Sequence, residues 1–192
     1  MTSNRVILYD TGIARVNQNW HIEAHKAPTG YGLHYRQRKE RLKRPFVGYG
    51  RLQPAIPDLE LQVRQLHHVS AASIKEFCKK ITREFAKLNI LVLHSLYMSK
   101  TFDKTVDGLE RHRGLNFVSS YLLSENLLPL LRRSSSPEFT SRLLFVSSRL
   151  HRFGTLPERG LTEPVPDWRS FDWWAAYTSS HLMTVTYANY LK

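Results

Sequence analysis

The sequence contains a single cysteine, Cys78, so no disulfide can form within the chain. It has no apolar run long enough to span a bilayer, and its first residues lack the apolar core of a secretory signal. No group of cysteine, histidine and carboxylate residues has the spacing of a zinc site, so we expect no metal. These absences favour a soluble globular domain, in which Cys78 is a packing residue on an apolar helix face.

Acidic residues are also scarce. The 192 residues include 16 Asp and Glu against 28 Lys and Arg, which gives a net charge of +12. Such a surface favours an acidic partner, which could be nucleic acid, an anionic membrane face or an acidic protein. A basic protein without such a partner is the alternative.

The positive charge is concentrated in residues 1–57, which hold ten Lys or Arg and three acidic residues. Glycines alternate there with aromatic residues, and a dense basic run follows, made of Arg36, Arg38, Lys39, Arg41, Lys43 and Arg44. This composition predicts an irregular basic arm that lies on a partner, or a degenerate first half of a Rossmann unit. A solvated basic helix or loop is the alternative.

Residues 58–192 instead show regular globular patterns. Apolar residues alternate in 59–63 and form short continuous runs at 90–93 and 143–146, which predict one half-buried strand and two buried strands. Three helices are predicted. The first begins after a cap at Ser70 or Ser73, the second covers 109–131, and the third covers 172–192. Strands that alternate with helices indicate an α/β fold with a parallel sheet and flanking helices.

Five short motifs in this part occur in a recognisable order. They are Lys87-Leu88-Asn89-Ile90-Leu91-Val92, Thr105-Val106-Asp107-Gly108-Leu109-Glu110, Leu115-Asn116-Phe117, Val146-Ser147-Ser148 and Tyr177-Thr178-Ser179-Ser180-His181. From about Leu52 onward the chain resembles the retinol-dehydrogenase-like branch of the short-chain dehydrogenase/reductase family. The resemblance implies an incomplete Rossmann-like sheet.

The resemblance also implies a catalytic set, which this chain keeps only in part. Asn116, Ser148 and Tyr177 retain the family's residue types, whereas the family's lysine is replaced by His181. A fixed cation beside the tyrosine lowers its pKa and makes it a usable proton donor or acceptor. A histidine with an ordinary pKa of about 6.5 is mostly neutral at pH 7. We therefore expect a pseudoenzyme, in which the three retained residues serve packing. If the site worked, Lys100 or Lys104 could replace the missing charge.

The positions that would hold a dinucleotide also depart from the family. Only Gly12 remains of a glycine-rich turn, His67 replaces an acid, and bulky residues replace a small, glycine-containing turn at Leu93, His94, Ser95 and Leu96. Bulk at such a turn obstructs close approach of a cofactor to the backbone. We expect no cofactor; NADP or NAD is implied if the catalytic alternative holds.

The family continues beyond the helix that carries the tyrosine, so strand 143–146 would have an open neighbouring position. We therefore expect this chain to rest against another protein or a separately encoded second half. Trp173 and Trp174 are candidates for such a contact, because clustered tryptophans bury a large area with few rotamers. They could equally cover the domain's own cleft.

We consider three functions for this chain, in order of preference. The first is a non-catalytic accessory subunit of a large assembly, mitochondrial rather than cytoplasmic, such as a respiratory complex or the mitochondrial ribosome. The alternative is an active NAD(P)-dependent oxidoreductase acting on a carbonyl or an alcohol. The second alternative is an RNA-binding protein, with the basic arm on phosphates and its aromatic residues stacked on bases.

Overall fold

The computed structural model describes residues 4–10, 25–27, 30–32, 59–94, 96–158 and 169–192. Contacts group the chain into two compact units, Met1–His67 and His68–Lys192. The boundary predicted after residue 57 stays a prediction. Gly12 and the basic run 36–44 lie outside the described residues.

The first unit contains a parallel pair of strands. Strand β1 (Asn4–Asp10) pairs with β4 (Leu59–Gln65), with Asn4 opposite Leu59 and Asp10 opposite Gln65. The strand predicted from alternation over 59–63 is thus confirmed. A short antiparallel pair, β2 (His25–Ala27) and β3 (Gly30–Gly32), belongs to the same unit.

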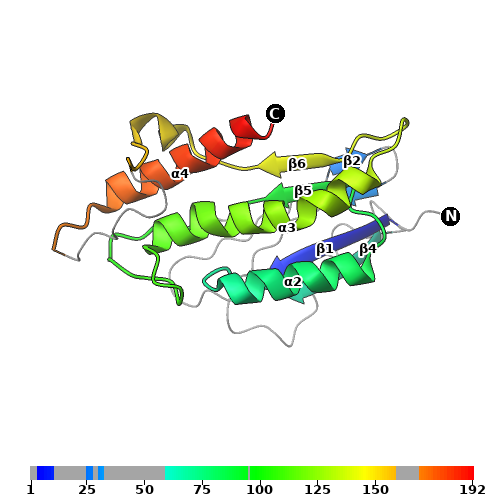
Figure 1. Ribbon diagram of the computed structural model, residues 1–192, viewed down its shortest axis with the longest axis horizontal. Helices are drawn as coiled ribbons and strands as arrows, with labels where there is room; N and C mark the ends of the chain where they lie inside the picture. Colours follow the sequence, from blue (N-terminus) through cyan, green and yellow to red (C-terminus); the bar gives the residue numbers. More distant parts are fainter. Residues whose placement is uncertain (1–3, 11–24, 28–29, 33–58, 95, 159–168) are drawn as a thin grey trace. The chain divides into compact units, whose positions relative to one another are not determined.

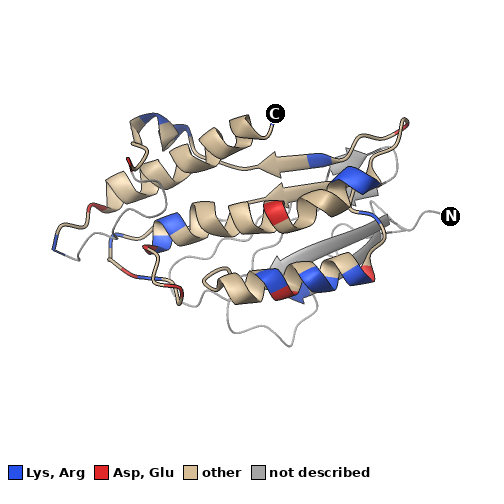
Figure 2. Ribbon diagram, viewed as in Figure 1, with Lys and Arg blue, Asp and Glu red and all other residues tan. Residues whose placement is uncertain are grey.

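The second unit begins with helix α2 (Ala71–Glu84). Of the two predicted caps, Ser70 is the one used, because its side chain accepts the backbone N–H of Ser73 at 3.3 Å. The helix buries one apolar face at helical intervals, made of Ile74, Phe77, Cys78 and Ile81. Cys78 is 2% exposed, which confirms its predicted packing role. The basic and acidic residues of this helix, coloured in Figure 2, are all exposed.

A parallel pair of strands forms the sheet of the second unit. Strand β5 (Ile90–Leu93) pairs with β6 (Arg142–Phe145), with Leu91 opposite Leu143. Strand β5 is buried, as its continuous apolar run predicts. The prediction of a buried strand at 143–146 was wrong, because β6 alternates between exposed and half-buried residues and Leu144 is 38% exposed.

One long helical segment connects these two strands. It starts at Arg111, passes through a π-helical stretch, η1 (Arg113–Val118), and continues as α3 (Ser119–Ser134). Helix α3 contacts α2, β5 and β6, and runs alongside the strands in Figure 1. Its fully buried leucines, Leu123, Leu127 and Leu130, form the centre of the core. The helix continues to Ser134, beyond the predicted end at 131.

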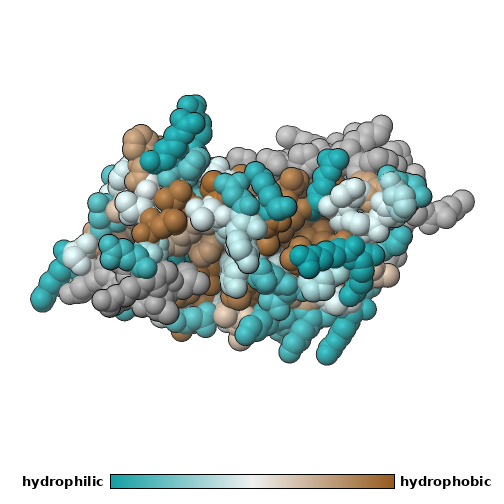
Figure 3. Space-filling model, turned by 45° about the horizontal axis from the view of Figure 1, so that its top comes forward, coloured by the Kyte–Doolittle hydropathy of each residue, from teal (hydrophilic) through white to brown (hydrophobic). Residues whose placement is uncertain are grey.

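The unit ends with a short 3₁₀ helix, η2 (Arg149–Phe153), and with α4 (Trp173–Tyr190). The Asp172 side chain caps α4 by accepting the N–H groups of Trp174 at 2.8 Å and Ala175 at 3.2 Å. Apolar and hydrophilic side chains are interspersed on the face seen in Figure 3. No helix within the described ranges is long and apolar enough to cross a membrane.

Gly154 joins η2 to α4 by close backbone contact. A Cβ atom at this position would lie 2.5 Å from the carbonyl oxygen of Thr178, which belongs to the α4 backbone. Since a helix backbone cannot move aside as a side chain can, no larger residue fits without displacing η2.

We expect Gly154→Ala to lower the free energy of unfolding by about 1–3 kcal/mol, through overpacking against α4. Urea unfolding at pH 7 measures the change. The matched control is Thr155→Ala at the exposed neighbouring position, which is expected to stay within about 0.5 kcal/mol of wild type. Equal stability of Gly154→Ala and wild type would contradict the packing described.

Candidate active site

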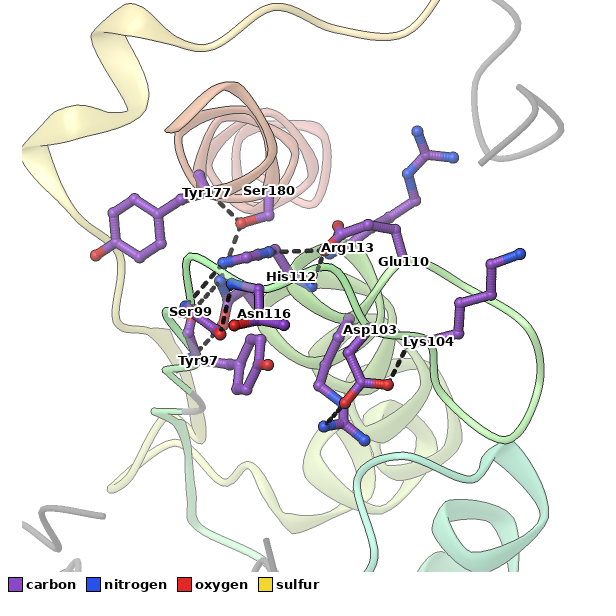
Figure 4. A network of polar contacts seen from close by, with 12 residues as sticks. Tyr97, Ser99, Asp103, Lys104, Glu110, His112, Arg113, Asn116, Tyr177 and Ser180 are labelled. Carbon is purple, nitrogen blue, oxygen red and sulfur yellow. Dashed lines mark hydrogen bonds and ion pairs between the residues drawn. The ribbon is translucent and has the colours of Figure 1, made fainter. Parts of the chain in front are cut away.

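The candidate site lies in the second unit, where the loop after β5, the η1 segment and the first half of α4 meet (Figure 4). Tyr177 and His181 are four residues apart, so both project from the same face of α4. Their rings lie 4.6 Å apart in an edge-to-face arrangement, a favourable geometry for two aromatic rings. Both residues are buried, with exposures of 6% and 2%.

Asn116 connects the three elements through its side-chain amide. Its Oδ1 accepts the backbone N–H of Tyr97 at 2.6 Å, and its Nδ2 donates to the Tyr97 carbonyl at 2.9 Å and to Ser180 Oγ at 3.0 Å (Figure 4). Its backbone carbonyl accepts the Thr184 hydroxyl at 3.2 Å. The amide therefore ties the loop after β5 to η1 and α4.

His181 occupies the position where the resemblance places a lysine. Its Nδ1 lies 3.2 Å from Ser147 Oγ, whereas its buried Nε2 has no hydrogen-bond partner within the described residues. Burial, reinforced by the neighbouring His112 and His151, lowers the pKa of His181 to about 4. The ring is therefore neutral at pH 7, as predicted, and supplies no positive charge to Tyr177.

The Tyr177 hydroxyl likewise makes no hydrogen bond within the described part of the chain. The two lysines considered as substitute cations have other neighbours: Lys100 Nζ lies 5.6 Å from the Trp173 ring centroid, and Lys104 Nζ lies 5.7 Å from that of Phe102. Neither of these two lysines is therefore placed against Tyr177 by the described contacts.

Ser148 is the third of the retained family residues, and the structure gives it a local role. Its hydroxyl caps η2 by accepting the N–H of Leu150 at 3.2 Å, and its carbonyl accepts His151 Nδ1 at 2.8 Å. No hydrogen bond joins Ser148 to Tyr177 or to Asn116 within the described residues. The three retained positions are thus not joined into one hydrogen-bonded set.

The predicted cofactor positions are spread over different environments. Leu93 is buried at the end of β5, His94 is half-buried, and Leu96 is 61% exposed, whereas Ser95 lies outside the described residues. His67 is exposed and belongs to the first unit. In the second unit the described glycines serve turns and packing: Gly114 lies against Thr105, Gly154 lies against Thr178, and Gly108 has a φ of 80°.

A nicotinamide dinucleotide, which the family fold implies, can be tested against these residues. The orphaned Nε2 of His181 and the unpaired hydroxyl of Tyr177 are polar atoms that a ligand's polar groups could satisfy. These two residues therefore fit the nicotinamide end of such a molecule. No three metal-ligating side chains gather within the described ranges.

Two residues of the network, Glu110 and His112, were missed at the sequence level. The Glu110 carboxylate accepts His112 Nδ1 at 2.7 Å, and Ser99 N–H donates to His112 Nε2 at 3.1 Å (Figure 4). A glutamate just before a helical pattern, two residues ahead of a histidine, is the only local signal, and it is weak. The His112 ring packs against Tyr97, Phe171 and Tyr177, residues that lie far from it along the sequence.

The predicted contact residues lie at the start of α4. Trp173 is half-buried, and Trp174 is 39% exposed with its ring 6.2 Å from that of Phe153. Their role in contacting a partner, like that of the basic arm, stays a prediction.

The described strands and helices form an incomplete Rossmann-like α/β fold. No family model matches the sequence. The chain is 29% identical over 150 residues to retinol dehydrogenase 14 of Mus musculus, covering 78% of this chain and 42% of that protein. It is 32% identical over 123 residues to human polyprenol dehydrogenase, covering 64% of this chain and 36% of that protein. It is 26% identical over 162 residues to a short chain dehydrogenase of Arthrobotrys oligospora, covering 83% and 50%.

Solved structures show the same fold. An uncharacterised protein from Mycobacterium paratuberculosis superposes with a TM-score of 0.55 at 25% identity, covering 74% of this chain and 47% of that one. The Pseudomonas aeruginosa RhlG/NADP complex superposes with a TM-score of 0.50 at 22% identity, covering 70% of this chain and 46% of that one. These similarities in sequence and fold support a member of the short-chain dehydrogenase/reductase family.

The chain spans about half or less of the length of these relatives. Their names favour the oxidoreductase alternative over the structural subunit that the sequence analysis put first. Nothing in these comparisons supports the expectation that no cofactor binds.

Two buried histidines predict a loss of stability in acid. Burial lowers the pKa of His68 and of His181 to about 4, whereas an unfolded chain protonates histidine near 6.5. Between these values the unfolded state binds more protons, so the free energy of unfolding falls as the pH decreases from 6.5 to 4. The slope is at most about 1.4 kcal/mol per pH unit for each histidine.

Urea unfolding over this pH range measures the slope. The variants His68→Gln and His181→Gln are each expected to flatten it, because each removes one depressed titration. An unchanged slope in the double variant would show that other groups cause the acid sensitivity.

Proposed function

We propose that this chain provides the catalytic site of a nicotinamide-dependent oxidoreductase that interconverts an alcohol and a carbonyl compound. Its relatives carry the names of dehydrogenases, and a neighbouring structure is described with NADP. The observation that carries the proposal is the buried pair of Tyr177 and His181, whose hydroxyl and Nε2 have no partner within the described residues.

The chemistry assigns one role to Tyr177. When bound, the nicotinamide would accept or deliver the hydride. In carbonyl reduction the substrate oxygen must gain a proton as the carbon gains the hydride, and the Tyr177 hydroxyl is the group placed to donate it. Its lack of an internal partner leaves it available for a substrate oxygen.

His181 limits the rate of this chemistry. Because its ring is neutral at pH 7, no cation stabilises the phenolate that forms when Tyr177 gives up its proton. We therefore expect slow turnover compared with a site that has a lysine at this position. His181 would contact the nicotinamide end through its unpaired Nε2.

A non-catalytic scaffold is the second candidate. Two observations favour it: His181 brings no charge to Tyr177, and the Asn116 side chain is already satisfied by Tyr97 and Ser180. In that case the retained family residues serve packing alone.

Oxidation of NADPH or NADH in the presence of small aldehydes and ketones separates the two candidates. We expect slow turnover that falls at least about 100-fold in Tyr177→Phe, because the proton donor is lost. The matched control is Tyr190→Phe, since Tyr190 lies on the same helix and is 84% exposed. Its turnover should equal that of wild type.

Two results would overturn the proposed enzyme. One is turnover in Tyr177→Phe equal to that of wild type. The other is a protein whose tryptophan fluorescence does not respond to either cofactor at millimolar concentration, and this result would favour the scaffold.

A further inference from the structure

A buried carboxylate and imidazole lie beneath the candidate active site. Glu110 is 3% exposed and His112 is 0% exposed. One oxygen, Oε1, accepts the backbone N–H of His112 at 2.8 Å and its ring Nδ1 at 2.7 Å, while Oε2 accepts the backbone N–H of Arg113 at 3.0 Å. Glu110 thereby caps the helical segment from Arg111 and holds the histidine ring.

The hydrogen bonds fix which nitrogen of His112 carries the proton. A backbone N–H can only donate, so the bond from Ser99 N–H at 3.1 Å requires an unprotonated Nε2. The proton must then be on Nδ1, which donates it to Glu110. Burial alone would raise the pKa of Glu110, but the hydrogen bonds from His112 and Arg113 outweigh it and lower that pKa, so the carboxylate is ionised at pH 7.

The oriented ring of His112 packs against the site. Its centroid lies 6.2 Å from that of Tyr177 in an edge-to-face arrangement, 5.1 Å from Tyr97 and 6.0 Å from Phe171. Within the described residues the Tyr177 hydroxyl makes no hydrogen bond, and its ring is held by contacts with the rings of His112 and His181. Of its two histidine neighbours, His112 is bonded at both nitrogens, whereas His181 is bonded at Nδ1 only.

We propose that His112, held in one tautomer by Glu110 and Ser99, is a positioning residue that sets the orientation of the Tyr177 ring. The expected effect on turnover rests on the proposed oxidoreductase function, whereas the expected effect on the orientation of the Tyr177 ring does not. His112 acts through Tyr177 and touches no reacting atom.

The substitution Glu110→Gln tests the contacts that run from Glu110 through His112 to Tyr177. Glutamine keeps one acceptor oxygen and replaces the other with an NH2 donor, so it cannot accept all three N–H groups that Glu110 accepts, and it removes the negative charge beside Nδ1. We expect nitrogen-15 spectra of the histidine rings to show Nδ1 protonation at His112 in wild type and a displaced Nδ1 signal in Glu110→Gln. Carbon-13 tyrosine spectra, with the Tyr177 signal assigned through Tyr177→Phe, should show that signal shifted in Glu110→Gln.

The matched control is His68→Gln. His68 is also buried and is hydrogen-bonded to the same helix through Ser119 at 3.1 Å. It should leave the Tyr177 signal in place. In turnover assays Glu110→Gln is expected to lower kcat about tenfold or more at an unchanged KM, because a misplaced proton donor affects the chemical step.

The outcomes separate this inference from the proposed function. A shifted Tyr177 signal in a protein without turnover would support the positioning role while the enzyme proposal fails. A Tyr177 signal unchanged in folded Glu110→Gln, or a kcat equal to that of an active wild type, would overturn the positioning role. If Glu110→Gln does not fold, the spectra of the wild-type protein test the proposal. Protonation of His112 at Nδ1, with NOE contacts from its ring to the Tyr177 ring, supports the proposal, and protonation at Nε2 overturns it.

Discussion

The hydrogen bonds of the Asn116 side chain are the interaction on which the candidate site depends. A buried amide is costly unless both its oxygen and its nitrogen have partners, and here Tyr97 and Ser180 supply them. Those partners belong to the loop after β5 and to α4. Satisfying one side chain therefore fixes the relative position of the three elements that surround Tyr177.

Burial then determines the electrostatics of the site. The neutral form of His181 is the one that a buried position without a carboxylate partner favours. Glu110 is ionised in an equally buried position because three N–H groups point at its oxygens. Among the described residues, the site therefore holds a negative charge behind His112 and a neutral His181 beside Tyr177, which is the reverse of what a tyrosine proton donor favours.

Local patterns predicted much of the second unit. The spacing of Ile74, Phe77 and Ile81 gave the buried face of α2, and the apolar run at 90–93 gave strand β5. The exposure of β6 could not be predicted, because an apolar run does not show whether a neighbour covers each face. The π-helical stretch around Asn116 has no recognisable sequence pattern either, since it depends on contacts with other elements.

The sequence by itself determined the resemblance to the short-chain dehydrogenase/reductase family, the α/β order of elements and the presence of His181 where that family has a lysine, because these follow from residue types and their order. Only the tertiary structure decided what the retained residues contact. It placed Ser148 as a helix cap, Asn116 as a tie between segments, and Glu110 with His112 beneath Tyr177. The physical reason is that hydrogen-bond partners and burial depend on residues far apart in the chain, which spacing along the sequence does not bring together.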